Sequence, residues 1–318
     1  MSREVHVRFC ESGRGKFPPA TRLREAELLR FEFIRVEKAN FPITILCRVL
    51  EVSRSGYYAW LRRPLCARRV ADEQISNEIQ EVHEQSVKRY GSPRIQKALL
   101  RKGRRVSRKR VARLMRQKGI YGRKKRKFKH TTDSNHQYQI APNVLERNFQ
   151  TERPDQVWVG DITYVWTLEG WLYLAVLIDL CTHQVVGWSM SANIDRFLAL
   201  DAFDMAVARR SPTPGLIHHT DRGSQYACPD YQLALKVNGF QPSMSRKGNC
   251  WDNAVAESFF GAIKEELIYT VAFTTRDAAR QAIFEYIEVF YNRQRLHSSI
   301  GYMSPIEFEL ANFHALAA

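Results

Sequence analysis

The chain of 318 residues is long enough for about two domains, and its 44% hydrophobic content excludes a disordered or collagen-like protein. No apolar run approaches the ~20 residues of a membrane-spanning helix, and the charged first residues argue against a secretory signal. The six cysteines include no Cys-x-x-Cys pair, which argues against a zinc module or a disulfide framework and favours a reduced, cytosolic protein.

The net charge of +16 is unevenly distributed along the chain. Residues 1–150 contain 36 Lys or Arg and 14 Asp or Glu, a net charge of +22, whereas residues 151–318 carry a net charge of −6. A basic half joined to a mildly acidic half indicates a polyanion-binding module attached to a module of another kind.

The first 72 residues are expected to be helical. Residues 1–40 form an extension with a helix over 21–40 and no sustained heptad repeat. Residues 41–72 resemble a small helix-turn-helix, in which Ser53 can cap a helix that carries aromatic side chains. The aromatic residues are Tyr57, Tyr58 and Trp60. Contact with DNA and a place in the core are equally open roles for them.

Residues 73–120 are predicted to form a three-helix DNA-binding domain. The second helix has Ser92 as its N-cap, and the third is capped by Ser107 and ended by Gly119. From Arg94 to Lys129, 18 of 36 residues are Lys or Arg and none is acidic. This is typical of a helix-turn-helix whose last helix enters the major groove; the alternative is an ordinary solvated basic helix. The expected DNA-binding residues are Arg108, Lys109, Arg110, Arg113 and Arg116.

After a basic linker over 121–150, the pattern changes to strands and helices. Strands are predicted over 157–166, 171–179, 185–190 and 216–220, and helices over 194–209 and 229–238. Short connections make the first three strands antiparallel neighbours. The predicted fold class is α/β, a ribonuclease-H-like core with a mixed sheet and flanking helices over 151–312, before a tail over 313–318. Residues 241–251 lack a period and are expected to form a mobile loop.

Three carboxylates occupy positions where acidic residues are uncommon. Asp161 lies inside an apolar strand, Asp221 directly follows the fourth strand, and Glu257 lies early in a helix. Two divalent cations ~3.5–4 Å apart need oxygen ligands from several elements, and can activate an attacking oxygen and stabilise a leaving one. The three acids could converge in this way; the alternative is that each caps a helix, pairs with a cation or lies exposed.

Nearby residues have competing interpretations. Asp179 ends the second strand and is expected in a turn rather than at a metal. His218 and His219 are expected to be strand or supporting residues, because a hard cation prefers oxygen. Asp252 and Asn253 are expected to cap the helix that carries Glu257. A DNA contact and a purely structural role are both open for Ser224, Gln225, Arg293, Arg295 and His297.

Six ordered motifs make the chain similar to OrfB, the second-frame product of bacterial insertion-sequence transposases with two reading frames. The resemblance extends from about residue 41 to residue 310. The matching stretches are VSRSGYYAW (52–60), RYGSPRI (89–95), WVGDITY (158–164), HTDRGSQY (219–226), DNAVAESFF (252–260) and YNRQRLHSSIGYMSP (291–305).

The resemblance implies a catalytic core like that of retroviral integrases. Asp161, Asp221 and Glu257, with 35 residues between the last two, would be the catalytic residues and the ligands of two Mg²⁺ ions, with Mn²⁺ as a substitute. Lys264 matches the basic residue that the family places seven positions after its Glu. That spacing puts Lys264 on the helix face of Glu257, where it can contact substrate phosphate. The implied reaction is DNA 3′-end cleavage and strand transfer without a covalent protein intermediate.

The implied partners are double-stranded DNA, at the element's terminal repeats and at the target, and further copies of the chain in a homo-oligomer on DNA. A first-frame OrfA product, or a frameshift fusion to it, is a further expected partner. The implied location is the bacterial cytoplasm, at the nucleoid, without membrane association. Two other classes remain open: a catalytically idle DNA-binding regulator or transposase remnant, and a nuclease that cuts without joining.

Overall fold

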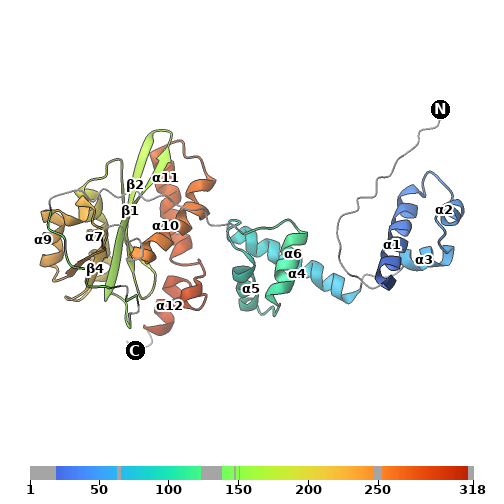
Figure 1. Cartoon of the computed structure of the whole chain (residues 1–318), viewed down its shortest axis with the longest axis horizontal. Coiled ribbons are helices and arrows are strands. Elements are labelled where there is room, and N and C mark those ends of the chain that lie inside the picture. The colour runs from blue at the N-terminus through green and yellow to red at the C-terminus, as the bar shows by residue number, and fades with distance from the viewer. Residues whose placement is uncertain are drawn as a thin grey trace. The chain divides into compact units, whose positions relative to one another are not determined.

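The computed structural model describes residues 19–62, 66–122, 138–146, 148–149, 151–246 and 253–313, with side chains from residue 26 onward. Most of the predicted basic linker, the second half of the predicted mobile loop and nearly all of the predicted tail lie outside these residues. The chain divides into two compact units, residues 1–73 and 74–318, which are described separately (Figure 1).

The first unit is a small helical core. It contains α1 (Pro19–Glu37), α2 (Ile43–Val49) and α3 (Arg54–Arg62), which agrees with the predicted helices. The ring of Tyr57 is fully buried, 6.0 Å from that of Phe31, and Trp60 packs against the same cluster. Of the two roles left open for the α3 aromatics, the structure therefore favours the core for Tyr57.

The second unit begins with a helical segment that contains part of α4 (Ala67–Gln85), α5 (Ser92–Arg101) and α6 (Arg108–Gln117). The Ser107 side chain accepts a hydrogen bond from the Arg110 N–H, so α6 has its predicted cap. In α5 the N-cap is Gly91 rather than Ser92, and Ser92 is already inside the helix. Helix α6 buries the predicted apolar stripe, formed by Val111, Leu114 and Met115.

A five-stranded sheet in the order β3-β2-β1-β4-β5 forms the centre of the remaining chain. The first three strands are antiparallel neighbours as predicted, whereas β1, β4 and β5 run parallel. The strands are β1 (Val157–Thr167), β2 (Gly170–Asp179), β3 (Val185–Ser191), β4 (Ile217–Thr220) and β5 (Gln241–Met244). Strand β5 corrects the loop prediction for its residues, because their backbone pairs with β4 at the sheet edge.

Helices cover both faces of this sheet (Figure 1). One hydrophobic cluster joins the sheet to α7 (Arg196–Arg210), α8 (Ser224–Ala227) and α9 (Pro229–Val237). A second cluster joins the opposite face to α10 (Ala254–Glu266) and α11 (Arg276–Phe284). The chain continues through η2 (Ile268–Thr270), η3 (Glu285–Tyr291), η4 (Ser298–Ile300) and α12 (Pro305–Asn312). The predicted α/β layer architecture is confirmed.

Within the described part of the chain, no helix is long and apolar enough to cross a membrane.

Candidate active site

Asp161 lies in the middle of β1, on the face that α10 covers. Side chains alternate along a strand, so Asp161 shares a face with Val159 and Val165, which pack into the cluster that contains α10. Strand β4 pairs with β1 only as far as Val159, so among the described residues no strand lies beside the β1 edge next to Asp161. The Asp161 Oδ1 atom accepts the backbone N–H of Ile162 at 2.8 Å.

Asp221 emerges beside Asp161 because β4 runs parallel to β1. The register pairs Val159 with His219, and β4 ends one residue before Asp221, so the turn that carries Asp221 begins beside the middle of β1. The Asp221 Oδ1 atom accepts the Gly223 N–H at 2.9 Å, which holds the carboxylate over the turn. A Cβ atom on Gly223 would lie 3.0 Å from that oxygen, so a larger residue there would press on the carboxylate.

Glu257 occupies the first turn of α10, and Asn253 places that helix against β1. Asn253 stands at the N-cap position, but its side chain makes no capping bond. Instead, its Nδ2 atom donates to the Gly160 carbonyl at 3.3 Å, on the uncovered edge of β1. The expectation of an Asn253 side-chain cap was therefore wrong, because the amide tethers the helix to the strand one residue before Asp161.

The electrostatics of Asp161 show that the predicted site residues lie near one another. Burial raises the pKa of Asp161 well above its usual value, the charge of Asp221 raises it further, and Glu257 adds to the effect. The Ile162 hydrogen bond and Lys264 act in the opposite direction. Among the residues that the structure describes, however, no group of three or more His, Cys, Asp or Glu is arranged to hold a metal ion.

Lys264 lies near Asp161, two turns along α10 from Glu257. Burial lowers the pKa of the Lys264 ammonium, and the charge of Asp161 partly offsets that effect. Its Nζ atom lies 5.5 Å from the centre of the Tyr164 ring, on β1. The predicted basic residue is thus placed where a phosphate near the acids could reach it.

Tyr226 is a residue near the acids to which the sequence assigned no role. It lies in α8, five residues after Asp221, and is 1% exposed. Burial raises its pKa well above the usual value, and Tyr231, Asp161 and Asp221 contribute to the rise. The only available signal was its place at the end of the HTDRGSQY motif.

The competing acid and histidine candidates have structural partners. The Asp179 carboxylate accepts the backbone N–H groups of Asp155 and Thr182, each at 2.7 Å, which confirms the turn interpretation. His218 is buried in β4, where its Nε2 atom lies 2.8 Å from the Tyr231 hydroxyl, and burial lowers its pKa to about 3. His219 is fully buried and contacts hydroxyl groups at the β5 end, so both histidines support the sheet.

Arg295 forms a buried ion pair with Glu266, in the last turn of α10. The Arg295 Nη2 atom donates to Glu266 Oε1 at 2.9 Å, and the Tyr286 hydroxyl donates to Oε2 at 2.8 Å. Arg94, from α5, places Nη1 3.5 Å from Oε1. Of the two roles left open for Arg295, the structure favours the structural one. An acidic residue in the last turn of a helix interacts unfavourably with the helix dipole. The position of Glu266 was therefore a sequence signal that its carboxylate has a positively charged partner, although not of which residue supplies it.

The RYGSPRI motif joins the helical segment to this end of α10. Arg89 Nε donates to the Glu266 carbonyl at 3.1 Å, and Arg94 Nε donates to the Leu296 carbonyl at 3.0 Å. The Tyr90 hydroxyl accepts the Leu296 N–H at 3.0 Å. Within the second unit, the motif therefore attaches the three-helix segment to the helix that carries Glu257.

The five basic residues predicted to bind DNA all lie on α6. Arg108, Lys109 and Arg116 are exposed, whereas Arg110 and Arg113 are half-buried. Arg113 Nη1 donates to the Gln117 side chain at 3.4 Å on the same helix. Three of the five are therefore fully accessible to a phosphate backbone.

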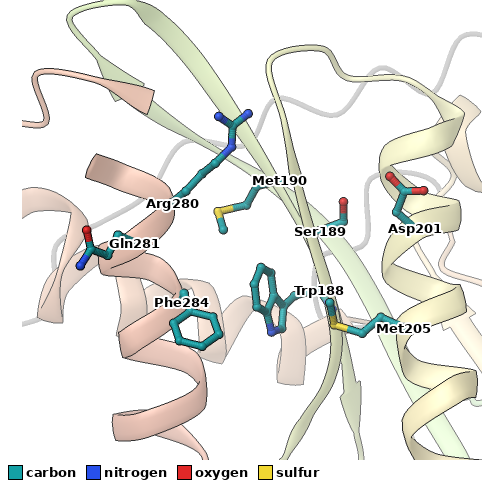
Figure 2. A pocket seen from close by; sticks show the side chains of 8 residues that line it. All are labelled: Trp188, Ser189, Met190, Asp201, Met205, Arg280, Gln281 and Phe284. Carbon is teal, nitrogen blue, oxygen red and sulfur yellow. The ribbon is translucent and has the colours of Figure 1, made fainter. Parts of the chain in front are cut away.

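A separate groove of about 420 Å³ lies at the β3 edge, between α7 and α11 (Figure 2). Trp188, Met190 and Phe284 supply much of its apolar lining. Strand β3 is two strands away from β1, and none of the predicted catalytic residues lines the groove.

Comparisons with known proteins place this arrangement in a family. Residues 70–128 match the HTH-like domain family, and residues 151–250 and 238–305 match two integrase core domain families. The catalytic core of HTLV-2 integrase in complex with magnesium is similar at a TM-score of 0.40 and 16% identity, covering 50% of this chain and 99% of that one. A simian T-cell lymphotropic virus intasome chain has a TM-score of 0.43 at 17% identity, covering 72% of this chain and 73% of that one.

Two bacterial relatives match over most of the chain. A protein of insertion element IS600 from Shigella sonnei, described as an uncharacterized 31 kDa protein, is 45% identical over 86% of this chain and 100% of its own length. The transposase InsF for insertion sequence IS3A, from Escherichia coli K12, is 42% identical over 89% of this chain and 99% of its own length. The chain therefore belongs to the family of insertion-sequence transposases that includes InsF.

Proposed function

We propose that this transposase cleaves 3′ ends at its element's terminal repeats and transfers them to target DNA, with Asp161, Asp221 and Glu257 as the catalytic carboxylates. The observation that carries the proposal is the meeting of β1, β4 and α10 at the uncovered edge of β1. The parallel register, which pairs Val159 with His219, supports a position for Asp221 near Asp161. The Asn253 tether to Gly160 brings the first turn of α10 to the same place.

The chemistry of the three side chains suits two divalent cations, Mg²⁺ or its substitute Mn²⁺, although in the described residues they are not grouped as a metal site. All three ligands would be carboxylates, and hard cations prefer oxygen. The charges of Asp221 and Glu257 raise the pKa of Asp161, which supports acids that repel one another unless positive charge lies between them. The chemistry supplied on binding is activation of the attacking oxygen and stabilisation of the leaving oxygen.

The protein's own residues would position the DNA around the acids. Lys264 would bind a phosphate oxygen near Asp161, because its ammonium lies within electrostatic reach of that carboxylate. The exposed cations of α6 would bind duplex phosphates. The RYGSPRI contacts would hold α6 and the acids in one unit, so that DNA bound by the first is presented to the second.

Further partners belong to the same proposal. Double-stranded DNA would be engaged at both the element ends and the target, by a homo-oligomer in the bacterial cytoplasm. A first-frame OrfA product, alone or as a frameshift fusion, would act together with this chain. What supports this part is membership of the transposase family.

A strand-transfer assay on the element's own ends, with Mg²⁺, tests the proposal. Asp161→Asn and Glu257→Gln are each expected to reduce cleavage and joining more than about 100-fold, because each removes several kcal/mol of charge stabilisation. Asp277→Asn is the matched control, since that exposed side chain pairs only locally with Arg280 in the described contacts. Joining that survives both substitutions would refute the assignment. Cleavage without joining would indicate a nuclease, and binding without either would indicate an idle regulator.

A further inference from the structure

A cluster of aromatic side chains is exposed on the β1–β2 hairpin. Tyr164, Trp166 and Trp171 are 38%, 55% and 42% exposed. The Trp171 ring centre lies 5.1 Å from that of Tyr164 and 4.8 Å from that of Trp166, with the rings close to perpendicular in both pairs. These three residues are called the hairpin aromatic cluster below. Large apolar side chains gathered on a surface are typical of a binding site.

The hairpin that carries this cluster is held rigidly. Arg276, at the start of α11, donates from Nε to the Trp171 carbonyl at 3.0 Å and from its backbone N–H to Glu169 at 2.8 Å. The Leu168 N–H donates to the Phe273 carbonyl at 3.0 Å. The exposure of the rings is therefore a property of an anchored hairpin, and a ligand would meet them already in place.

The cluster adjoins the candidate active site through Lys264. Tyr164 follows Asp161 by three residues on β1, about 10 Å along an extended strand, and the alternation of side chains starts it on the opposite face of that strand from Asp161. Lys264 connects the two, because its Nζ atom lies 5.5 Å from the Tyr164 ring centre and its charge acts on Asp161. Among the described residues, no strand pairs with β1 on the β4 side between Asp161 and Tyr164, so the path between the acids and the rings runs along this edge as far as the bridge from Phe273 to Thr167.

We propose that the hairpin aromatic cluster binds unpaired nucleobases of the DNA strand whose phosphate lies at the acids. The inference rests on the proposed function and adds to it a binding site for bases. Nucleic acid carries anionic groups and flat π faces at short intervals, which matches a cation that adjoins exposed rings. Bases inside a duplex have both faces covered by their neighbours. The site therefore selects an end that is frayed or single-stranded.

The test uses the full chain without divalent metal, so that no DNA is cleaved. The probes are two DNA duplexes of the same sequence, one blunt and one with a short 3′ overhang that contains 2-aminopurine. Wild-type protein is expected to quench the 2-aminopurine fluorescence by stacking and to bind the overhang duplex more tightly than the blunt one. Trp166→Leu keeps apolar bulk but removes the aromatic face, and is expected to abolish quenching and weaken overhang binding about tenfold.

Three comparisons make the result specific. Trp166→Phe keeps an aromatic face and is expected to retain the overhang preference. Blunt-duplex affinity is expected to be unchanged in both variants. Phe197→Ala is the matched control, because this ring is 57% exposed and adjoins the Arg196 guanidinium at 4.9 Å, but lies on α7, away from the hairpin.

Several outcomes would overturn the inference. Trp166→Leu could bind both duplexes like wild type, or lose affinity for both equally; neither fits a base site. A change in oligomeric state with unchanged DNA binding would make the cluster a protein interface. If wild-type protein joins DNA in Mg²⁺ while Trp166→Leu binds the overhang duplex as tightly as wild type, the base site alone is refuted. Overhang selectivity without any joining would refute the proposed function alone.

Discussion

Replacing Glu266 by Gln tests whether the buried ion pair at the end of α10 stabilises the second unit. Glu266 and Arg295 are 6% and 7% exposed, and the carboxylate also accepts the Tyr286 hydroxyl. The substitution leaves the Arg295 guanidinium buried without an opposite charge. Breaking a buried pair in this way costs about 3–5 kcal/mol, so the free energy of unfolding is expected to fall by that amount.

The pH dependence of this loss follows from the direction of the pKa shift. Burial alone would raise the pKa of Glu266, but the charge and hydrogen bonds of Arg295, with the charge of Arg94, outweigh it and lower the pKa. A carboxyl whose pKa is lower in the folded state stabilises the fold above its unfolded pKa, and this contribution disappears as pH falls through the folded pKa. The difference between Glu266→Gln and wild type is therefore expected to be full at neutral pH and to shrink in acid.

Urea denaturation at pH 7 and in acid measures both effects. Glu81→Gln is the matched control, because Glu81 pairs with Lys102 at the surface, where their side chains are 57% and 42% exposed, respectively. An exposed pair contributes about 0–1 kcal/mol. If Glu266→Gln cost no more than Glu81→Gln, or if its cost did not change with pH, the buried pair would not be a stabilising element and the reasoning would be refuted.

Three further results are expected. Removing exposed cations from α6 should lower the slope of log affinity against log salt by about 0.9 for each phosphate that the protein no longer neutralises, and an unchanged slope would exclude α6 from the DNA interface. The three to replace by Gln are Arg108, Lys109 and Arg116. Asp161→Asn removes a half-buried carboxyl that neighbouring acids repel, so it should raise the melting temperature of the metal-free protein, while Mg²⁺ should raise that of wild type alone. Gly223→Ala would place a Cβ atom 3.0 Å from the Asp221 carboxylate oxygen, and the displaced carboxylate should reduce joining by up to about tenfold while DNA binding persists; equal joining would show that the turn tolerates the added atom.

Much of the fold follows from patterns that act over a few residues. Enrichment in β-branched and aromatic residues between turn signals predicts β1 and β2, and the short connections between the first three strands leave antiparallel pairing as the simple solution. The hydroxyl of Ser107 predicts the start of α6 because a capping bond joins residues three apart. Strand β5 escaped prediction, because a short edge strand that contains Pro242 is recognised only by its pairing with β4.

The candidate site likewise contains features that the sequence predicts and contacts that it does not. The place of Asp161 inside an apolar strand, and of Asp221 directly after another, marks both as unusual acids on residue type and position alone. The partners of Asn253 and Glu266 were not predictable, because Asn253 bonds to a carbonyl 93 residues away and Arg89 reaches Glu266 across 177 residues. Contacts of that separation depend on which faces the packed layers bring together.

By itself, the sequence determined the segregation of charge, four of the five strands and the unusual positions of the three acids, since each of these is written in residue type and spacing, whereas Lys264 was identified through the family resemblance. Tertiary structure alone decided that the RYGSPRI motif attaches the helical segment to α10, and that Arg295 is buried against a carboxylate. It also decided that the aromatic rings of the β1–β2 hairpin are exposed. The physical reason is that burial and pairing are properties of surfaces that meet only when the chain has folded.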